Sequence, residues 1–191
     1  MGTSLSATTV RVMAGCLVGG VIALATTSCE TIPDPFIIEC ADLETFPPVS
    51  NVLEKRCGTI DCHGSFARPL RIFGRGGMRY HADANDYFDF GPDQDAGYVS
   101  GGVGTTEEEY EANWRSVCGL QPEIMTQVVR DGADPLQLLI LAKPLGPDEE
   151  GGQRHKGGVL LIKGGVAYDC IKTWIEGNVD NAACAEATAE L

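Results

Sequence analysis

The stretch Leu53–Ser65, LEKRCGTIDCHGS, marks the point where a helical pattern gives way to a motif of cysteine and histidine. Val49, Val52 and Leu53 stand at positions i, i+3 and i+4, which places them on one face of a helix. That face continues towards Cys57. We therefore predict a helix that begins near Val49 and delivers its C-terminal end to the motif.

The motif itself has the residue types that covalent haem attachment needs. Two thiols add to the vinyl groups of the porphyrin, and a histidine directly after the second thiol reaches the iron. Cys62 and His63 are adjacent as required, although four residues rather than two separate Cys57 from Cys62. Gly58 would let the extra residues bulge outward, since glycine tolerates positive φ, and Gly64 would relieve crowding after the ligand. This interpretation makes Cys57 and Cys62 the attachment sites of haem c, and His63 the proximal iron ligand.

Two haem-free interpretations fit the same motif. A disulfide between Cys57 and Cys62 would close a tight loop and leave His63 as a surface residue, which suits an exported chain. Alternatively, Cys57, Cys62 and His63 could join a fourth ligand around a metal ion, although the spacing matches no standard zinc module. The motif alone leaves all three interpretations open.

The N-terminal residues have the order of features that defines a secretory signal. One positive charge, Arg11, precedes an apolar run up to Ala25, and small residues then lead to Cys29. The run is shorter than the roughly 20 residues that span a bilayer, and the small residues before the cysteine resemble a bacterial lipobox. We expect a signal peptide at residues 1–28, a lipid on Cys29 that anchors the chain to a membrane, and a proline-containing tether at residues 29–47. The expected location is the bacterial cell envelope, facing the periplasm or the exterior.

The chain is strongly acidic, with 27 acidic and 14 basic side chains and a formal net charge of −13. Removal of the signal would take away one basic residue, Arg11, and no acidic one, which leaves a charge of −14. Such a surface repels nucleic acid and anionic lipid headgroups. Nucleic-acid binding is therefore excluded, and a protein partner attracted by the net charge would be basic.

Eight cysteines are present, of which Cys16 would leave with the signal and Cys29 would carry lipid. Export favours disulfide formation among the others. If Cys57 and Cys62 bind haem, the last four can form two disulfides in any of three pairings. If they do not, the same six cysteines can form three disulfides. The four whose pairing stays open are Cys40, Cys118, Cys170 and Cys184.

Glycines interrupt any regular period between residues 64 and 104. The aspartates of this segment fail the calcium-loop template because Tyr87 occupies a ligand position, so we interpret them as a solvated acidic loop. Neither GxSxG nor HExxH occurs, nor does a phosphate-binding glycine loop. The sequence thus gives no support to a hydrolase or a nucleotide-binding protein.

Helical signals return in the second half of the chain. Thr106 and Glu109 form a capping box, and Pro122 begins a helix that reaches about Arg130. Asp134–Pro135 leads a helix that Pro144 is expected to end, and GVAYDCIKTWIEG, residues 165–177, forms the last helix. The predicted fold is mainly α with long glycine-rich loops, over residues 48–178, followed by a C-terminal tail at residues 179–191.

The segment Leu138–Asn178 resembles the end of cytochrome c-like domains of the planctomycete type. In that family a leucine-rich turn with Lys-Pro precedes a histidine flanked by glycines, then a closing helix with Trp-Ile. The resemblance covers about Val49 to Asn178 and implies a cytochrome c-like fold with covalent haem c. The matching residues are Leu139, Lys143, Pro144, His155, Gly157, Gly158, Trp174 and Ile175.

The sixth ligand to the iron is predicted to be His155, which lies between glycines on a loop. Met125, Met78 and His81 are alternatives, and apolar residues such as Leu53, Trp174 and Ile175 would line the haem.

We thus predict a monohaem c-type cytochrome-like envelope lipoprotein that passes single electrons to a basic redox partner. Because no catalytic acid, base or arginine stands out, an electron carrier is favoured over an enzyme. The alternative is a haem-free, disulfide-stapled lipoprotein of the cell surface with a binding or scaffolding role.

Overall fold

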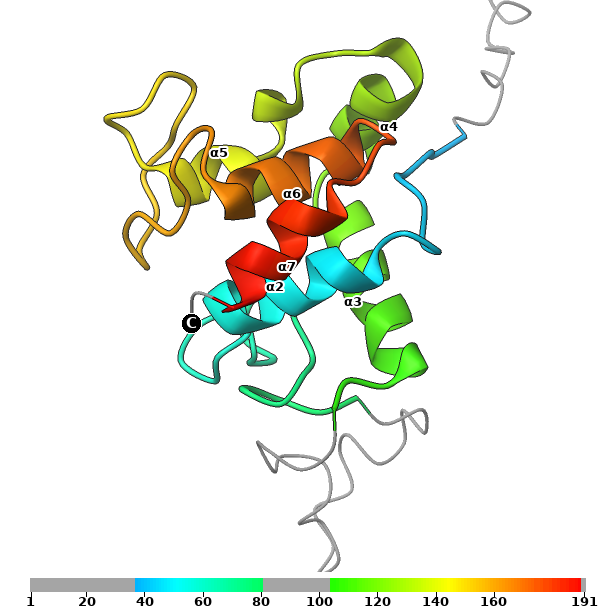
Figure 1. Cartoon of the computed structure of the whole chain (residues 1–191), viewed down its shortest axis with the longest axis vertical. Coiled ribbons are helices and arrows are strands. Elements are labelled where there is room, and N and C mark those ends of the chain that lie inside the picture. The colour runs from blue at the N-terminus through cyan, green and yellow to red at the C-terminus, as the bar shows by residue number, and fades with distance from the viewer. Residues whose placement is uncertain (1–36, 81–103, 190–191) are drawn as a thin grey trace, which may run out of the picture. The chain divides into compact units, whose positions relative to one another are not determined.

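The computed structural model describes residues 37–80 and 104–189. The chain divides into two compact units, residues 1–37 and 38–191, and all the helices described here belong to the second unit. The predicted signal peptide, the lipidation site Cys29, the aspartate-rich loop and His81 lie outside the described residues. Within the described part the fold is mainly helical and contains no strand (Figure 1). Its elements are α2 (Pro47–Cys57), α3 (Glu107–Cys118), α4 (Pro122–Asp131), the 3-10 helix η2 (Pro135–Gln137), α5 (Leu139–Leu145), α6 (Val166–Ile175) and α7 (Asn181–Ala189).

Helix α2 forms where its apolar period predicts and ends at Cys57. Two prolines, Pro47 and Pro48, occupy its first turn, where a missing N–H costs no hydrogen bond. Val49, Val52 and Leu53 are buried against the rest of the core. The helix contacts α3, α6 and α7, so the motif at its C-terminal end is attached to the centre of the domain.

Helices α6 and α7 form a hairpin that lies against α2 (Figure 1). A disulfide between Cys170 and Cys184 joins the two helices. The sequence predicts a C-terminal tail at residues 179–191, whereas α7 packs in the core through Ala183, Cys184 and Ala187. Its first turn is capped by Asp180, whose Oδ1 accepts hydrogen bonds from the backbone of residues 182 and 183 at 3.0 Å.

The segment before α2 is fixed to α3 and α4. Cys40 forms a disulfide with Cys118 at the end of α3, and the indole of Trp114 donates to the carbonyl of Ala41 at 2.7 Å. The backbone N–H of Glu39 donates to Thr126 Oγ1 at 2.9 Å. Residues 39–46, which the sequence assigned to the tether, thus belong to the folded domain.

The predicted capping box is confirmed, because Thr106 and Glu109 exchange their two hydrogen bonds at the start of α3. The expectation of a single helix from Asp134 to Pro144 is wrong, because the structure has two separate helices there. Leu138 is extended, with ψ of 129°, and separates η2 from α5. The side chain of Gln121 accepts from the N–H of Leu139 at 2.5 Å and caps α5 from outside, which a local pattern does not reveal.

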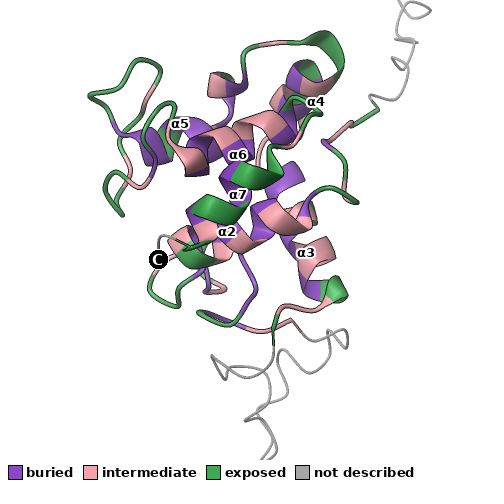
Figure 2. Cartoon of the chain, viewed as in Figure 1, coloured by how far each residue is buried: buried purple, intermediate pink, exposed green. Residues whose placement is uncertain are grey.

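Buried positions concentrate on the helices, whereas the connection between α5 and α6 is largely exposed (Figure 2). The two disulfides are typical of a protein that folds in an oxidising compartment. Among the described helices, none is both long and apolar enough to cross a membrane.

Candidate functional site

The motif turns sharply as soon as α2 ends. The N–H of Gly58 donates to the carbonyls of Leu53 and Glu54 at 3.0 Å, and the N–H of His63 donates to the carbonyl of Cys57 at 2.9 Å. The expectation that Gly58 has positive φ is wrong, because its φ is −83°. Glycine is needed there for space: a Cβ would lie 2.8 Å from the carbonyl oxygen of Glu54.

Three glycines bring separate backbone segments together beside the motif. A Cβ on Gly64 would lie 2.1 Å from the carbonyl oxygen of Gly58 and 2.8 Å from the Cα of Gly77. A Cβ on Gly77 would lie 2.2 Å from the same oxygen. The N–H of Met78 also donates to the carbonyl of Gly64 at 3.0 Å. The chain after His63 therefore folds back onto the motif through close backbone contacts.

Cys57 and Cys62 are free thiols, whereas the other four cysteines of the described residues form the two disulfides. Cys57 is buried, and Cys62 is partly exposed. Burial, followed by the neighbouring Cys62, raises the pKa of Cys57 to about 12. The raised pKa keeps the Cys57 thiol in its neutral, protonated form in this structure. The described residues likewise hold no group of three or more His, Cys, Asp or Glu side chains that could bind a metal ion.

His63 is oriented by the chain that follows it. Its Nδ1 lies 3.0 Å from the carbonyl oxygen of Leu70, so the neutral ring donates from Nδ1 and leaves Nε2 as the basic nitrogen. Histidines that bind a metal commonly have this arrangement, because the second hydrogen bond fixes the tautomer and the ring. Burial is the main cause that lowers the pKa of His63, which favours the neutral form that a ligand requires.

His155 lies on the connection between α5 and α6 and faces the same region. Its ring centroid is 6.0 Å from that of His63, and the two ring planes differ by 8°. Its Nδ1 lies 3.3 Å from the carbonyl oxygen of Gly158, so it too has a backbone partner at Nδ1. Hydrogen bonds of 2.8 Å from Gln153 N and Leu160 N to α5 carbonyls attach the chain on both sides of His155. The structure thus brings together two histidines that are far apart in sequence.

The residues present fit a haem c iron better than the other interpretations of the motif. A nitrogen of a metal-bound imidazole lies about 2 Å from the metal, so two imidazoles that share one metal ion have ring centroids no more than roughly 6 Å apart. The separation of His63 and His155 agrees with this value. The same site contains the two unpaired cysteines.

The remaining candidate residues are part of the apolar interior. Met125 and Met78 are buried, and Met125 belongs to the core cluster. Leu53, Ile175 and Trp174 are buried as well. Trp174 packs on Phe46 with ring centroids 4.8 Å apart, at the beginning of α2 and thus at the end away from Cys57.

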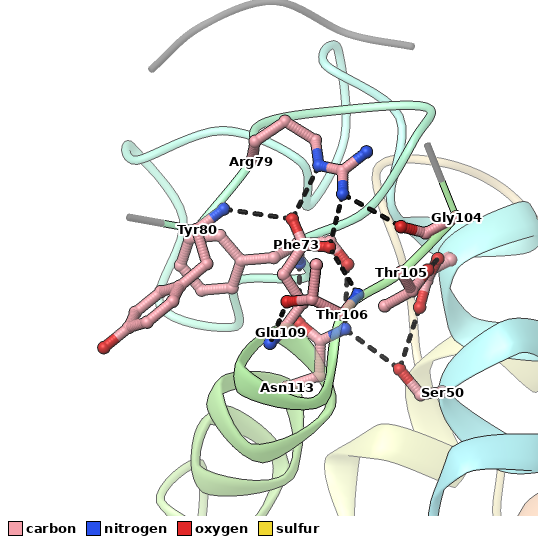
Figure 3. Close-up of polar contacts among 10 residues, drawn as sticks. Ser50, Phe73, Arg79, Tyr80, Gly104, Thr105, Thr106, Glu109 and Asn113 are labelled. Atoms are coloured by element: carbon pink, nitrogen blue, oxygen red, sulfur yellow. Dashed lines mark hydrogen bonds and ion pairs between the residues drawn. The ribbon is translucent and has the colours of Figure 1, made fainter. Parts of the chain in front are cut away.

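A buried polar network holds the segment that follows the motif (Figure 3), and the sequence analysis did not predict it. Glu109 is 1% exposed and accepts from Arg79 Nε at 2.6 Å and Arg79 Nη2 at 2.7 Å. The N–H of Tyr80 also donates to this carboxylate at 3.1 Å. On the next turn of α3, Asn113 donates to the carbonyl of Phe73 at 2.8 Å and accepts from its N–H at 2.6 Å. Residues 73–80 are thereby fixed to α3.

The network extends to α2 near the motif. Ser50 accepts from Asn113 at 2.9 Å and donates to Glu54 at 3.0 Å. Thr105 donates to the other oxygen of Glu54 at 2.6 Å. Burial is the largest cause that raises the pKa of Glu54. The only sequence signal for any of these contacts was the capping box, which placed Glu109 at the start of a helix.

The chain matches no protein-family model, no curated protein and no solved structure.

Proposed function

We propose that the protein is a monohaem c-type cytochrome-like lipoprotein of the cell envelope that transfers single electrons. Cys57 and Cys62 would hold the haem through thioether bonds, and His63 and His155 would bind its iron. The observation that carries this proposal is the pair of nearly parallel histidine rings, 6.0 Å apart, in a site with two unpaired cysteines.

Each protein group has a defined part in this proposal. The carbonyl of Leu70 holds the ring of His63, and the carbonyl of Gly158 holds that of His155. The buried thiol of Cys57 stays protonated at neutral pH, so it resists oxidation until it is used for attachment. Bound haem would supply a one-electron couple between ferric and ferrous iron.

Ligation by two histidines favours a carrier over a catalyst. If His63 and His155 both held the iron, the protein itself would supply the two ligands that a substrate would otherwise have to replace. The attachment of the loop to α5 on both sides of His155 supports a lasting ligand.

The envelope location is supported by the two disulfides and by the features of residues 1–28. In this proposal Cys29 carries the lipid anchor, and the domain meets a redox partner outside the cytoplasm.

Intact-mass spectrometry of the chain expressed with a c-type maturation system tests the proposal. We expect the mass of one covalent haem together with two disulfides, and the haem should remain after denaturation. The variant Cys57→Ala/Cys62→Ala should keep both disulfides and lose the haem. A colourless chain with three disulfides would contradict the proposal and support the haem-free, disulfide-stapled lipoprotein.

A further inference from the structure

The basic residues are unevenly distributed along this acidic chain. Residues 53–80 and 143–163, which carry the motif and His155, contain 10 of the 14 basic side chains and only 5 of the 27 acidic ones. Their formal charge is +5, whereas the rest of the chain has −18. The segments that carry the candidate site thus have a positive formal charge within a protein whose net charge is −13, and their sum stays positive when Arg79 is set against its partner Glu109.

Four exposed cations belong to the immediate surroundings of the two histidines. Arg68 Nε donates to the carbonyl of Cys62 at 3.3 Å. Lys143 lies on α5 between Ala142 and Pro144, whose carbonyls accept hydrogen bonds from the chain on the two sides of His155. Arg154 and Lys156 flank His155 in sequence, and all four cations are exposed.

Acidic groups on the same loops are fewer, and three of them are consecutive at residues 148–150. Asp61 is exposed in the motif, and residues 148–150 are acidic. Lys163 is within 3.5 Å of one of these carboxylates, that of Glu150. Lys163 is thus the partner of an acidic residue in the run 148–150. Arg68, in contrast, donates to the backbone carbonyl of Asp61 and not to its carboxylate.

Exposed apolar side chains occur on the same two loops. Ile60, between the motif cysteines, is 54% exposed, and Val159 and Ile162, after His155, are 58% and 70% exposed. Figure 2 shows the connection between α5 and α6 as mainly exposed. Apolar residues with charged residues around them are the usual composition of a protein docking surface.

We propose that Arg68, Lys143, Arg154 and Lys156, together with Ile60, Val159 and Ile162, form the docking surface for an electron-transfer protein with an acidic face. We name these seven residues the basic docking surface. The inference rests on the haem function proposed above and reverses the partner charge that the net charge alone suggests. Each encounter would move one electron between the two proteins, with no bond made or broken. A charged patch acts at short range, within roughly one Debye length of 8 Å at physiological salt, where it outweighs more distant charges of opposite sign.

A protein is a better occupant than the two alternatives. An anionic membrane extends beyond the basic loops on every side, so the 22 acidic side chains outside these loops would repel it. A second copy of this chain also carries acidic groups outside these loops, so the self-association test below distinguishes it from a different partner protein.

The test compares two small oxidants, an anion and a cation, on the full-length, haem-loaded, detergent-solubilised chain. Ferricyanide and tris(phenanthroline)cobalt(III) each accept one electron from the reduced protein, and stopped-flow absorption gives their rates against ionic strength. We expect the ferricyanide rate to fall as salt is added and the cobalt rate not to fall. The variant Lys143→Glu/Lys156→Glu should slow ferricyanide roughly 10-fold at low salt.

The control variant Arg115→Glu/Arg130→Glu makes the same charge change on α3 and α4, outside both basic loops. It should slow ferricyanide much less. A ferricyanide rate that rises with salt in the wild type, or equal slowing in both variants, would overturn the basic docking surface.

Two further results would also overturn it. The first is salt-sensitive binding to phosphatidylglycerol vesicles that is lost in Lys143→Glu/Lys156→Glu. The second is a dimer at low salt that the same variant abolishes. A chain without covalent haem would instead contradict the proposed function, so the two failures are distinguishable.

Discussion

The helical core and the loops that carry His63 and His155 are held by different forces. In the core, α2 packs on α6 and α7, and two disulfides join elements that are distant in sequence. In the loops, single backbone hydrogen bonds, close glycine contacts and one buried ion pair fix the positions of the side chains. The core therefore tolerates changes that conserve apolar volume, whereas the site depends on a few backbone atoms.

The largest expected effect belongs to the core disulfides. Removing Cys40–Cys118 with alanines should lower the free energy of unfolding by about 4 kcal/mol, and removing Cys170–Cys184 by about 3 kcal/mol. The first closes a longer loop, with sequence separations of 78 and 14. Denaturant unfolding measures both losses. In the native state, both variants should keep the covalent haem and the approach of the His63 ring to the His155 ring. A native-state haem spectrum that is no longer low-spin in either disulfide variant would show that the core and the site are not separate.

Next in size is the glycine contact at the site. Gly64→Ala places a Cβ 2.1 Å from a backbone oxygen, so the chain must shift at the cost of about 3 kcal/mol. We expect lower stability and poorer haem incorporation, measured by unfolding and by the ratio of haem to protein. Gly76→Ala is the matched control, because the nearest atom to its Cβ lies at 4.0 Å. Similar behaviour of the two variants would contradict the close packing.

The buried ion pair gives a smaller effect. Glu109→Gln keeps the shape of the side chain but removes the charge that Arg79 meets, which should cost about 2 kcal/mol. Glu111→Gln on the same helix removes an exposed pair with Arg115 and should cost at most about 0.5 kcal/mol. Equal unfolding midpoints for the two variants would refute the role of the network in fixing residues 73–80.

The smallest effect is a dependence of stability on pH at Glu54. Burial raises the pKa of this carboxyl above its ordinary value of 4.5, so the folded protein binds its proton more tightly than the unfolded chain does. Its contribution to stability is therefore present below pH 4.5 and is lost as pH rises through the higher folded pKa. Measured by urea unfolding, the stability of wild type minus that of Glu54→Gln should fall as pH rises above 4.5. A difference that is constant or rises with pH would show that burial does not control this group.

The sequence predicted the features that depend on local patterns. The apolar period gave α2 and α6, and the capping box gave the start of α3. It missed α7, whose alanine-rich sequence has almost no amphipathic pattern, although Asp180 was a usable N-cap signal. It also missed the break at Leu138, because the cap from Gln121 is a tertiary contact.

The same distinction applies to the site. The adjacency of Cys62 and His63 is local and could be read directly. The orientation of His63 depends on the carbonyl of Leu70, and its approach to His155 depends on the packing of a distant loop on α5. The free state of Cys57 and Cys62 depends on how the other cysteines pair, and sequence arithmetic left that open.

Carbon monoxide binding to the reduced protein tests most directly whether His63 and His155 hold one iron. We predict that the wild type, reduced with dithionite, shows a six-coordinate low-spin spectrum that carbon monoxide does not change. His155→Ala should open one coordination position and bind carbon monoxide, while His81→Ala, the matched change at the third histidine of the chain, should behave as the wild type. Carbon monoxide binding by the wild type, or an unchanged spectrum in His155→Ala, would contradict the proposal that His63 and His155 hold one haem iron.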